Sequence, residues 1–368
     1  MLRFLHAADL HLCSALATFS AGAAAERRRR QLDALEQLFA TAVEKGAQMI
    51  LLAGDVFDTP NPEENGAARF FAICAAQPVP VIVSPGNHDP FVERSVWQRH
   101  DLPRNLYVFD STALSCFEFS TLGAAVYGYA FCGENMPSPA LGSGHRLLPD
   151  RVPILLAHAD LLSPLSPYAP ISGEQLERAG FAYAALGHIH KAPEAVRYGK
   201  TVAAYSGFFA GRGFDEVGAG RALLVEIADS HVSTVPLEST ADRFALAELD
   251  CEGARNNEEI YTRLRGYLEK ADFPAGTALR VRLVGNVGLS CRVEIPRLAT
   301  LGGGLALFEL RDETLPLYDS DYLEKDPTLR GAFYRALLPH LRAADAETRA
   351  TAAEALRIGF AALADREV

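Results

Sequence analysis

The chain has 368 residues, of which 49% are hydrophobic, and its formal net charge is -11. This length and hydrophobic content allow one large domain with one or two small ones, and they exclude a largely disordered chain. The negative charge argues against a protein that coats nucleic acid, because such binding neutralises phosphates with Lys and Arg. A phosphate substrate remains compatible with this charge, since bound divalent cations would offset it locally.

The six cysteines, at positions 13, 74, 116, 132, 251 and 291, lie far apart in the sequence. Scattered single cysteines are typical of reduced and mostly buried thiols, so we expect a cytoplasmic protein. Cys13 is the one cysteine beside a candidate metal motif. Because no stretch is long and apolar enough to span a bilayer, the sequence predicts no membrane insertion.

Three apolar runs alternate with two helical patterns near the start of the chain. Short apolar runs rich in β-branched residues and bounded by Gly or Pro are typical of buried strands. The alternation predicts parallel strands joined by right-handed crossovers, with their carboxyl ends on one edge of a sheet. The expected strands and helices, in chain order, are Met1–Leu5, Glu26–Lys45, Gln48–Ala53, Glu63–Ala76 and Val79–Ser84.

Polar side chains follow each of these three strands. Asp9 and His11 come after the first strand, Asp55 after the second, and Asn87 with His88 after the third. Loops at strand carboxyl ends commonly carry catalytic or metal-binding groups. Because all three ends share one edge, we expect these side chains to converge. Carboxylate, amide and imidazole groups together are plausible ligands of a divalent metal.

The first predicted helix carries the basic run Arg27–Arg30 near its start, and Gly46 follows it as a candidate C-terminal cap. We interpret the basic run as a solvated first turn, with contact to nucleic-acid phosphate as the alternative. Further along, Val92–His100 is predicted to be a helix that packs through Trp97, and Leu106–Gly128 to contain antiparallel strands.

Histidines follow two later strands. A strand at Arg151–Ala157 ends at His158, and a strand at Tyr183–Leu186 leads into Gly187, His188 and His190. Two histidines spaced by two residues after a strand repeat the pattern of Asp9 and His11. The other elements expected in this part are a helix at Gly173–Ala179, a strand at Val202–Tyr205, and a closing hairpin formed by Arg221–Ile227 and His231–Pro236.

The composition changes within Ser239–Asp250, where we place the main domain boundary. We expect a large domain over residues 1–240, a small α+β module over 241–315, and a helical segment over 316–368. An amphipathic helix at Asn257–Lys270 and strands at Leu279–Leu283 and Leu305–Arg311 would form the module. Asp326 and Pro327 resemble an N-cap followed by proline at the first helical position, and a final helix is expected from Asp345 to Ala364.

The ordered set Asp-x-His, Gly-Asp, Gly-Asn-His-Asp, His and Gly-His-x-His resembles the calcineurin-like metallophosphoesterases. It is most similar to the SbcD/YhaO group of DNA-repair exonucleases, and the similarity covers the first 240 residues. Loops at Tyr168–Pro170, Ala185–Lys191 and Ser206–Arg212 resemble the YhaO branch, as do the C-terminal stretches Ala355–Leu363 and Arg366–Val368. The resemblance implies an α/β sandwich of two central mixed β-sheets flanked by helices, with the small module and terminal helices appended.

The resemblance also implies two divalent metal ions. One would be held by Asp9, His11, Asp55 and His190, and the other by Asp55, Asn87, His158 and His188. Asp55 would bridge the two ions, as a carboxylate can. Mixed nitrogen and oxygen ligands suit Mn²⁺, Fe or Zn²⁺ better than Ca²⁺, and the absence of thiolates weighs against structural zinc. The family resemblance points to Mn²⁺.

In this family the position of His88 orients the phosphate and protonates the leaving oxygen. We expect Asp89 to support the loop or a ligand. The family's second histidine is replaced by Asp58, which either orients His88 by accepting a hydrogen bond or caps the loop. Arg212 is a candidate contact for substrate phosphate, with a surface salt bridge as the alternative. The arginines of the small module are interpreted as a solvated strand face, with DNA contact as the alternative; they are Arg280, Arg282 and Arg292.

The leading hypothesis is a two-metal phosphodiesterase that acts on DNA as an exonuclease, with endonuclease activity as an option. The resemblance implies an SMC-like coiled-coil ATPase of the SbcC/YhaN type as partner, and a dimer of nucleases. The terminal helices around Phe333–Leu341 and Leu356–Leu363 would dock that partner or cap the chain's own core. The alternative function is a small-molecule phosphodiesterase, for example of cyclic nucleotides. A scaffold without catalysis is a third option, against which the full ligand set argues.

Overall fold

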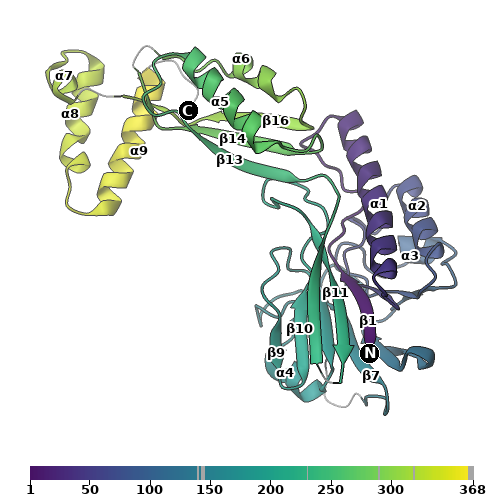
Figure 1. Ribbon diagram of the computed structural model, residues 1–368. Helices are drawn as coiled ribbons and strands as arrows, with labels where there is room; N and C mark the ends of the chain where they lie inside the picture. Colours follow the sequence, from purple (N-terminus) through teal and green to yellow (C-terminus); the bar gives the residue numbers. More distant parts are fainter. Residues whose placement is uncertain (139–140, 142–145, 230, 289–290, 318–319, 364–368) are drawn as a thin grey trace. The chain divides into compact units, whose positions relative to one another are not determined.

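A computed structural model of the protein describes residues 1–138, 141, 146–229, 231–288, 291–317 and 320–363 (Figure 1). Its contacts divide the chain into two compact units. The first comprises Met1–Ala245 with Ala275–Ala278, and the second comprises Leu246–Pro274 with Leu279–Val368. The chain thus leaves the first unit at Ala245, inside the window where its composition changes.

The first sheet of the first unit has six strands in the order β12-β11-β1-β2-β3-β4. The strands β1 to β4 are parallel, which for β1 to β3 is the direction expected from crossovers through helices, and β11 pairs with β1 in antiparallel register. The predicted hairpin of β11 and β12 is confirmed. The strand bounds are Leu2–Ala7 (β1), Ile50–Leu52 (β2), Val81–Val83 (β3), Leu106–Val108 (β4), Arg221–Ala228 (β11) and His231–Glu238 (β12).

The second sheet also has six strands, in the order β5-β6-β7-β8-β10-β9. Its four inner strands are parallel, and both edge strands run antiparallel to their neighbours. The expectation of antiparallel strands within 106–128 is therefore right for β5 and β6 and wrong for β4, which pairs in parallel with β3. The bounds are Ser115–Phe119 (β5), Ala124–Gly128 (β6), Val152–His158 (β7), Tyr183–Gly187 (β8), Val196–Tyr198 (β9) and Thr201–Tyr205 (β10).

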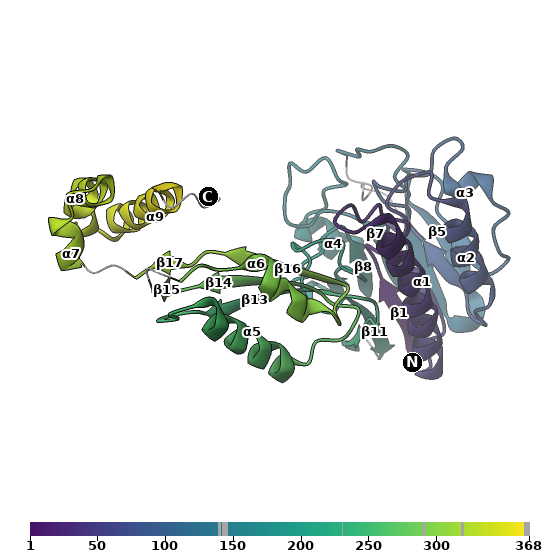
Figure 2. The same ribbon diagram turned by 90° about the horizontal axis from the view of Figure 1, so that it is seen from above.

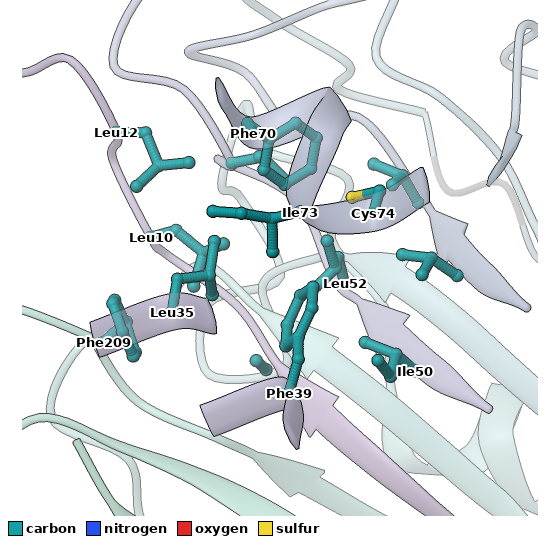
Figure 3. Close-up of a cluster of buried hydrophobic side chains, with 14 of the residues drawn as sticks. Leu10, Leu12, Leu35, Phe39, Ile50, Leu52, Phe70, Ile73, Cys74 and Phe209 are labelled. Carbon is teal, nitrogen blue, oxygen red and sulfur yellow. The ribbon is translucent and has the colours of Figure 1, made fainter. Parts of the chain in front are cut away.

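The two mixed sheets form a sandwich with helices outside. Helices α1 (Ala21–Glu44) and α2 (Glu64–Ala75) lie side by side on the outer face of the first sheet (Figures 1 and 2). Phe39 and Phe70 from these helices pack over Ile50 and Leu52 (Figure 3). Helix α4 (Gly173–Ala179) packs on the second sheet through Leu176. The predicted α/β sandwich is confirmed.

Each central strand of the first sheet is apolar on both faces, because helices cover one face and the second sheet covers the other. In β2, Ile50 and Leu52 face the helices, whereas Leu51 faces the other sheet, where it joins Ile154 and Val126. This period of two explains why the strands read as continuous hydrophobic runs instead of alternating patterns. The core between the sheets fixes how their ends meet.

Helix α1 begins five residues before the predicted start. Ser20 caps it by accepting a hydrogen bond from the backbone N–H of Ala23, so Arg27–Arg30 do not lie in the first turn. The interpretation of this run as solvated is wrong for Arg27, which is 5% exposed and lies against the rings of Phe19 and Phe244. The cap at Gly46 is confirmed: its φ is +86° and its N–H donates to the carbonyl of Val43.

The predicted helix at Val92–His100 is shorter than expected. Helix α3 spans only Val96–Arg99, because Arg94 has a left-handed φ of +63° that no helix can continue through. Trp97 is buried and packs against Phe57, and its indole N–H donates to the carbonyl of Asp89. The tryptophan therefore also holds the loop that carries Asn87 and His88.

The second unit begins with a three-stranded sheet in the order β13-β14-β16. Helix α5 (Asn257–Ala271) buries Ile260 and Leu264, as the amphipathic pattern predicts. The other elements are β13 (Phe244–Asp250), β14 (Ala278–Val284), β15 (Asn286–Val287), α6 (Ile295–Ala299), β16 (Leu307–Asp312) and β17 (Leu315–Pro316), with short 3₁₀ turns at Thr300–Gly302 and, in the first unit, at Ser120–Leu122.

Three terminal helices form a small core of their own: α7 (Ser320–Lys325), α8 (Leu329–Leu341) and α9 (Ala346–Leu363). The prediction of Asp326 as N-cap is wrong. Thr328 precedes α8, and the Asp326 carboxylate instead accepts hydrogen bonds from the N–H and hydroxyl of Thr328. The predicted end at Ala364 and the stretch Arg366–Val368 lie outside the described residues. No helix in the described part of the chain is long and apolar enough to cross a membrane.

His6 joins the two sheets from within the core. Its Nδ1 lies 2.9 Å from the Tyr183 hydroxyl and its Nε2 lies 3.2 Å from the carbonyl oxygen of Leu186. Since a carbonyl only accepts, Nε2 carries the proton and Nδ1 accepts from tyrosine, which satisfies a neutral imidazole. Burial outweighs the carbonyl bond and lowers the pKa of His6 to about 3.

This buried histidine predicts a loss of stability in mild acid. Below pH 6.5 the unfolded chain protonates His6 while the folded chain does not, until about pH 3, so the free energy of unfolding falls as the pH falls through that window. Between pH 6.5 and 5 the contribution of His6 is about 2 kcal/mol. Urea unfolding of the wild type and His6→Gln at both pH values, with chelator present, measures this difference.

The matched control is His231→Gln, which changes an exposed histidine at the start of β12. It should keep the pH dependence of the wild type. An equally steep pH dependence in His6→Gln would contradict the assignment.

Candidate metal centre

The carboxyl ends of strands from both sheets meet in the first unit. Backbone bonds fix this meeting: the N–H of Asp9 donates to the carbonyl of Gly54, and that of His11 donates to the carbonyl of Asp55. The N–H of His188, at the end of β8, donates to both carboxylate oxygens of Asp9 at 3.1 Å. All seven predicted ligands follow strands that end here; they are Asp9, His11, Asp55, Asn87, His158, His188 and His190.

Four of these residues have left-handed backbone angles. The φ values are +51° for Asp9, +43° for His11, +50° for Asp55 and +104° for His188. Such angles are uncommon in residues other than glycine and cost free energy. Strained residues concentrate at functional sites, where the geometry of side chains matters more than local stability. The strain at Asp9, Asp55 and the two histidines therefore supports their choice as candidate site residues.

Glycines allow the strand ends to come this close. A Cβ atom on Gly86 would lie 2.1 Å from the carboxylate of Asp55, and one on Gly187 would lie 1.9 Å from the carbonyl oxygen of Ala53. No side chain fits at either place. The glycine that precedes Asn87 and the glycine that precedes His188 are thus required by close approach.

One group of ligand atoms, which we call the first position, comprises side chains of Asp9, His11, Asp55 and His190. The Nε2 atoms of His11 and His190 lie 3.3 Å apart. Asp55 Oδ2 is 3.7 Å from Nε2 of His11, and Asp9 Oδ1 is 3.6 Å from Nε2 of His190. Two carboxylate oxygens and two imidazole nitrogens therefore face one point.

The tautomers of the two histidines follow from their outer partners. Nδ1 of His11 lies 3.0 Å from Asp58 Oδ1, and Nδ1 of His190 lies 2.6 Å from Glu216 Oε1. Ionised carboxylates only accept, so both Nδ1 atoms donate. In their neutral form, which is the form that binds metal, the two rings present lone pairs at Nε2 that repel each other. A cation between them removes this repulsion, so the donor set fits a bound metal.

The second position comprises side chains of Asp55, Asn87, His158 and His188. His158 is fully buried, and its Nδ1 donates to the carbonyl oxygen of Ala53 at 3.0 Å. Its Nε2 faces Asn87 Oδ1 at 3.0 Å and Asp55 Oδ2 at 3.4 Å. The same oxygen of Asp55 also belongs to the first position. Acceptors again face one another, which fits a second cation.

His188 is the fourth member of the second position, and its ring lies next to that of His158. The centroid of its ring is 5.2 Å from that of His158, and its Nε2 is 4.0 Å from Asp160 Oδ2. Burial, together with the neighbouring His158, lowers the pKa of His188 to about 4. The imidazole is therefore neutral at physiological pH and has a nitrogen lone pair for a metal ion.

The carboxylate of Asp58 takes neither of the two roles expected from the sequence, which were to orient His88 and to cap the loop. Its carboxylate contacts His11 and the guanidinium of Arg212, whereas its distance to Nδ1 of His88 is 3.9 Å. His88 instead donates from Nδ1 to the backbone carbonyl of Asp58 at 3.2 Å. The side chain of Asp58 thus orients a predicted metal ligand, and its backbone orients His88.

Arg212 is also more than a surface salt bridge. One guanidinium nitrogen lies 2.9 Å from Asp58 Oδ1 and another lies 3.0 Å from Glu216 Oε1. Burial opposes the ionisation of Glu216, but hydrogen bonds from His190 and Arg212 outweigh it and lower its pKa to about 2. Sequence reasoning missed Glu216, and its only signal is its place in the glycine-containing loop after Arg212.

Asp89 supports the loops from behind. Its buried carboxylate accepts hydrogen bonds from the backbone N–H groups of Val56, Phe57 and Gly86. These bonds join the loop after β2, which carries Asp55, to the loop after β3, which carries Asn87. The carboxylate therefore fixes the relative place of ligands from two strands.

Four further residues were candidates from the sequence: Cys13, Arg280, Arg282 and Arg292. Burial raises the pKa of Cys13 to about 11, so its thiol is protonated and is a poor metal ligand. Arg280 pairs with Glu309, and Arg282 pairs with Glu313 and Glu248, as expected for a solvated strand face. Arg292 is exposed.

Comparisons with known proteins give a family match and two similar proteins. The family described as calcineurin-like phosphoesterase matches residues 2–192, just over half of the chain. The chain is similar to "Uncharacterized metallophosphoesterase YhaO" of Bacillus subtilis (strain 168), with 25% identity over 294 residues, which covers 77% of this chain and 71% of the relative. It is also similar to the SbcD subunit of the nuclease SbcCD of the same organism, with 26% identity over 340 residues, covering 81% and 82%.

The resemblance expected from the motifs is thus confirmed. The matched residues include strands β1 to β8 and all seven predicted ligands. The donor set of carboxylate, amide and imidazole groups fits divalent metal ions at two positions that share Asp55. The chain belongs to the calcineurin-like phosphoesterase family, whose members are metal-dependent hydrolases.

Proposed function

We propose that the chain is a two-metal phosphodiesterase that hydrolyses DNA phosphodiester bonds, acting as an exonuclease in DNA repair or end processing. The observation that carries the proposal is the shared oxygen of Asp55, which lies 3.7 Å from Nε2 of His11 and 3.4 Å from Nε2 of His158. Two positions joined by one carboxylate suit phosphodiester hydrolysis, which needs charge stabilisation on both the attacking and the leaving oxygen.

The ligands of the first position would hold one ion and those of the second position the other. Mixed nitrogen and oxygen donors suit Mn²⁺, Fe or Zn²⁺, and among these the family resemblance points to Mn²⁺. When bound, the ions supply Lewis acidity toward the phosphate and lower the pKa of water. The protein holds the ligands in place through backbone hydrogen bonds and through hydrogen bonds that the carboxylates of Asp58, Glu216 and Asp89 accept.

His88 is proposed as the general acid. Its side chain is 41% exposed, the ring lies edge-on to that of His11 with centroids 4.8 Å apart, and its Nδ1 is held by the carbonyl of Asp58. Nε2 is then the ring nitrogen that can meet a bound phosphodiester. A protonated imidazole there donates its proton to the leaving oxygen of the sugar, which otherwise leaves as a poor alkoxide.

DNA is proposed as the substrate because of the extent of the similarity. The alignment with the nuclease subunit covers 81% of this chain, more than the part matched by the phosphoesterase family, so it includes residues after 192. We accordingly propose residues 1–240 as the nuclease domain, 241–315 as an accessory domain and 316–368 as a partner-docking segment. We also propose a cytoplasmic location and a dimer of nuclease domains.

The proposed partner is an SMC-like coiled-coil ATPase that docks on the terminal helices. The relative's name describes a subunit of a nuclease. Leu329 is 70% exposed and Ile358 is 40% exposed, although α7 to α9 bury a core of their own. A chain that ends after residue 317 should lose binding to the ATPase and keep hydrolysis of bis(p-nitrophenyl) phosphate. Undiminished binding would exclude these helices as the docking site.

A substrate comparison tests the proposed function. We expect the purified chain with Mn²⁺ to shorten end-labelled single-stranded or double-stranded DNA, and EDTA to stop the reaction. Cyclic nucleotides are assayed in parallel under the same conditions. Hydrolysis of cyclic nucleotides without any cleavage of DNA would replace the nuclease by the small-molecule alternative, and a chain without metal or activity would be a scaffold.

A further inference from the structure

Three charged side chains lie beside the first position: Asp58, Arg212 and Glu216. We name this set the carboxylate bracket. We propose that the bracket orients both imidazole ligands of the first position, and so makes this position bind its metal ion more tightly than the second. The inference rests on the two-metal site proposed above, and it concerns how the two positions differ.

The bracket is built from four short contacts. Asp58 accepts from Nδ1 of His11 at 3.0 Å, and Glu216 accepts from Nδ1 of His190 at 2.6 Å. Arg212 spans the two carboxylates, with guanidinium nitrogens at 2.9 Å from Asp58 and 3.0 Å from Glu216. Its backbone N–H also donates to Glu216 at 2.9 Å.

The bracket joins two loops that are far apart in the sequence. Asp58 follows β2, whereas Arg212 and Glu216 lie in the loop between β10 and β11. The side chains of Asp58 and Glu216 are only 19% and 6% exposed, so the two carboxylates would repel each other strongly without the arginine. A guanidinium offers donors in a rigid fork, so one side chain can hold both carboxylates at a fixed separation.

The consequence for the histidines is direct. A carboxylate on Nδ1 fixes the tautomer in which Nε2 has the lone pair, holds the ring, and makes the imidazole a stronger ligand. Both imidazoles of the first position have such a partner. Their Nε2 atoms meet at 3.3 Å, so the bracket prepares the position before any ion arrives.

The second position differs in the partners of its imidazoles. His158 donates from Nδ1 to a neutral carbonyl, that of Ala53. Nε2 of His188 is 4.0 Å from Asp160, beyond hydrogen-bond distance. Within the described ranges, therefore, no carboxylate is hydrogen-bonded to the ring of His188, and the carboxylate beside the ring of His158 is that of Asp55, the shared ligand, which faces Nε2 at 3.4 Å. A neutral carbonyl fixes the tautomer of His158 but increases its basicity less than an anion does.

The difference is measurable without any substrate. The chain is freed of metal with EDTA, dialysed, and titrated with Mn²⁺ by calorimetry, while electron paramagnetic resonance measures the free ion. We expect two sites of unequal affinity in the wild type. Glu216→Gln, Asp58→Asn and Arg212→Gln should each weaken the tighter site by about 10- to 100-fold and leave the weaker site unchanged.

Two further variants make the test specific. Arg212→Lys keeps the positive charge but cannot span both carboxylates, so it should weaken the tighter site less than Arg212→Gln does. If the other variants do not fold, Arg212→Lys still tests whether the guanidinium is needed for tight binding at the first position. Arg3→Gln is the matched control: it removes a half-buried arginine paired with Glu226 at the far end of β1, and it should bind both ions as the wild type does.

The inference is overturned if the bracket variants bind both ions as the wild type does, or if both sites weaken equally while Arg3→Gln is unaffected. Two equal sites in the wild type would overturn it as well. A wild type that binds no Mn²⁺, Fe²⁺ or Zn²⁺ would instead contradict the proposed two-metal function. The two failures are thus distinguishable in one titration series.

Discussion

Asp55→Asn is expected to abolish measurable hydrolysis of phosphodiesters by the chain with Mn²⁺, with a loss of at least about three powers of ten in kcat/KM. The carboxylate is shared by both metal positions, and stabilisation of transition-state charge by a metal ion is worth several kcal/mol, of which each 1.4 kcal/mol is about tenfold in rate. Asparagine keeps the size of the side chain, and it tolerates the left-handed φ of +50° at this position. The fold should therefore survive the change.

The measurement has two parts. Initial rates on DNA and on bis(p-nitrophenyl) phosphate give the loss of activity, and the melting temperature with and without Mn²⁺ gives the loss of metal binding. An ion that binds only the folded chain stabilises it by RT ln(1 + [L]/Kd), so the wild type should melt higher in Mn²⁺ and Asp55→Asn should respond much less. Full activity in Asp55→Asn would exclude a bridging role for this carboxylate.

His88→Gln is expected to slow cleavage of DNA by about 10²- to 10⁴-fold in kcat, with both metal ions still bound. Glutamine cannot supply a proton to the leaving oxygen. His88 lies beside the ligands, with its Nδ1 bonded to the carbonyl of Asp58, so its removal should leave the metal positions intact. Calorimetric titration of His88→Gln with Mn²⁺ checks the second half of this expectation.

The leaving group separates acid catalysis from simple positioning. p-Nitrophenolate leaves without a proton, so His88→Gln should lose far less activity on bis(p-nitrophenyl) phosphate than on DNA. An equal loss on both substrates would show that His88 positions the phosphate and does not protonate the leaving group. His231→Gln, at an exposed histidine on β12, controls for the change of residue type and should cleave both substrates normally.

Much of the site was predictable because its signals are local. Each ligand follows a short apolar strand, and such strands are recognised from a few residues. The alternation of strands with helices then predicts parallel strands joined by right-handed crossovers. That topology places Asp9, Asp55 and Asn87 on one sheet edge before any coordinates are known. The family motifs add His158, His188 and His190 by their order in the chain.

The partners of these ligands were not predictable in the same way. Glu216 lies in a loop without periodicity, and nothing in its neighbours indicates that its carboxylate meets His190. Asp58 was expected to face His88 or to cap its loop, but the turn after β2 directs its carboxylate to His11 and Arg212. Such contacts depend on loop conformation to within about 1 Å, which hydrophobic pattern does not encode.

Arg27 in helix α1 shows the same limit of prediction from the sequence. A run of four arginines is typical of a solvated surface, and Arg29 is indeed exposed and paired with Glu26 and Asp33. Arg27 is buried because Phe19 and Phe244, far apart in the chain, meet over it. Burial of a charge depends on what packs against it, and only the folded chain decides that.

The sequence by itself determined the parallel direction of β1 to β3, the sheet edge at which the predicted ligands converge, and a set of residue types suited to bind metal. Those features follow from strand periodicity, crossover handedness and the chemistry of carboxylates and imidazoles. Only the tertiary structure decided which oxygen faces which nitrogen. It joined Asp58, Arg212 and Glu216 into one bracket at the first position, because loops between strands take their conformation from the elements that they contact.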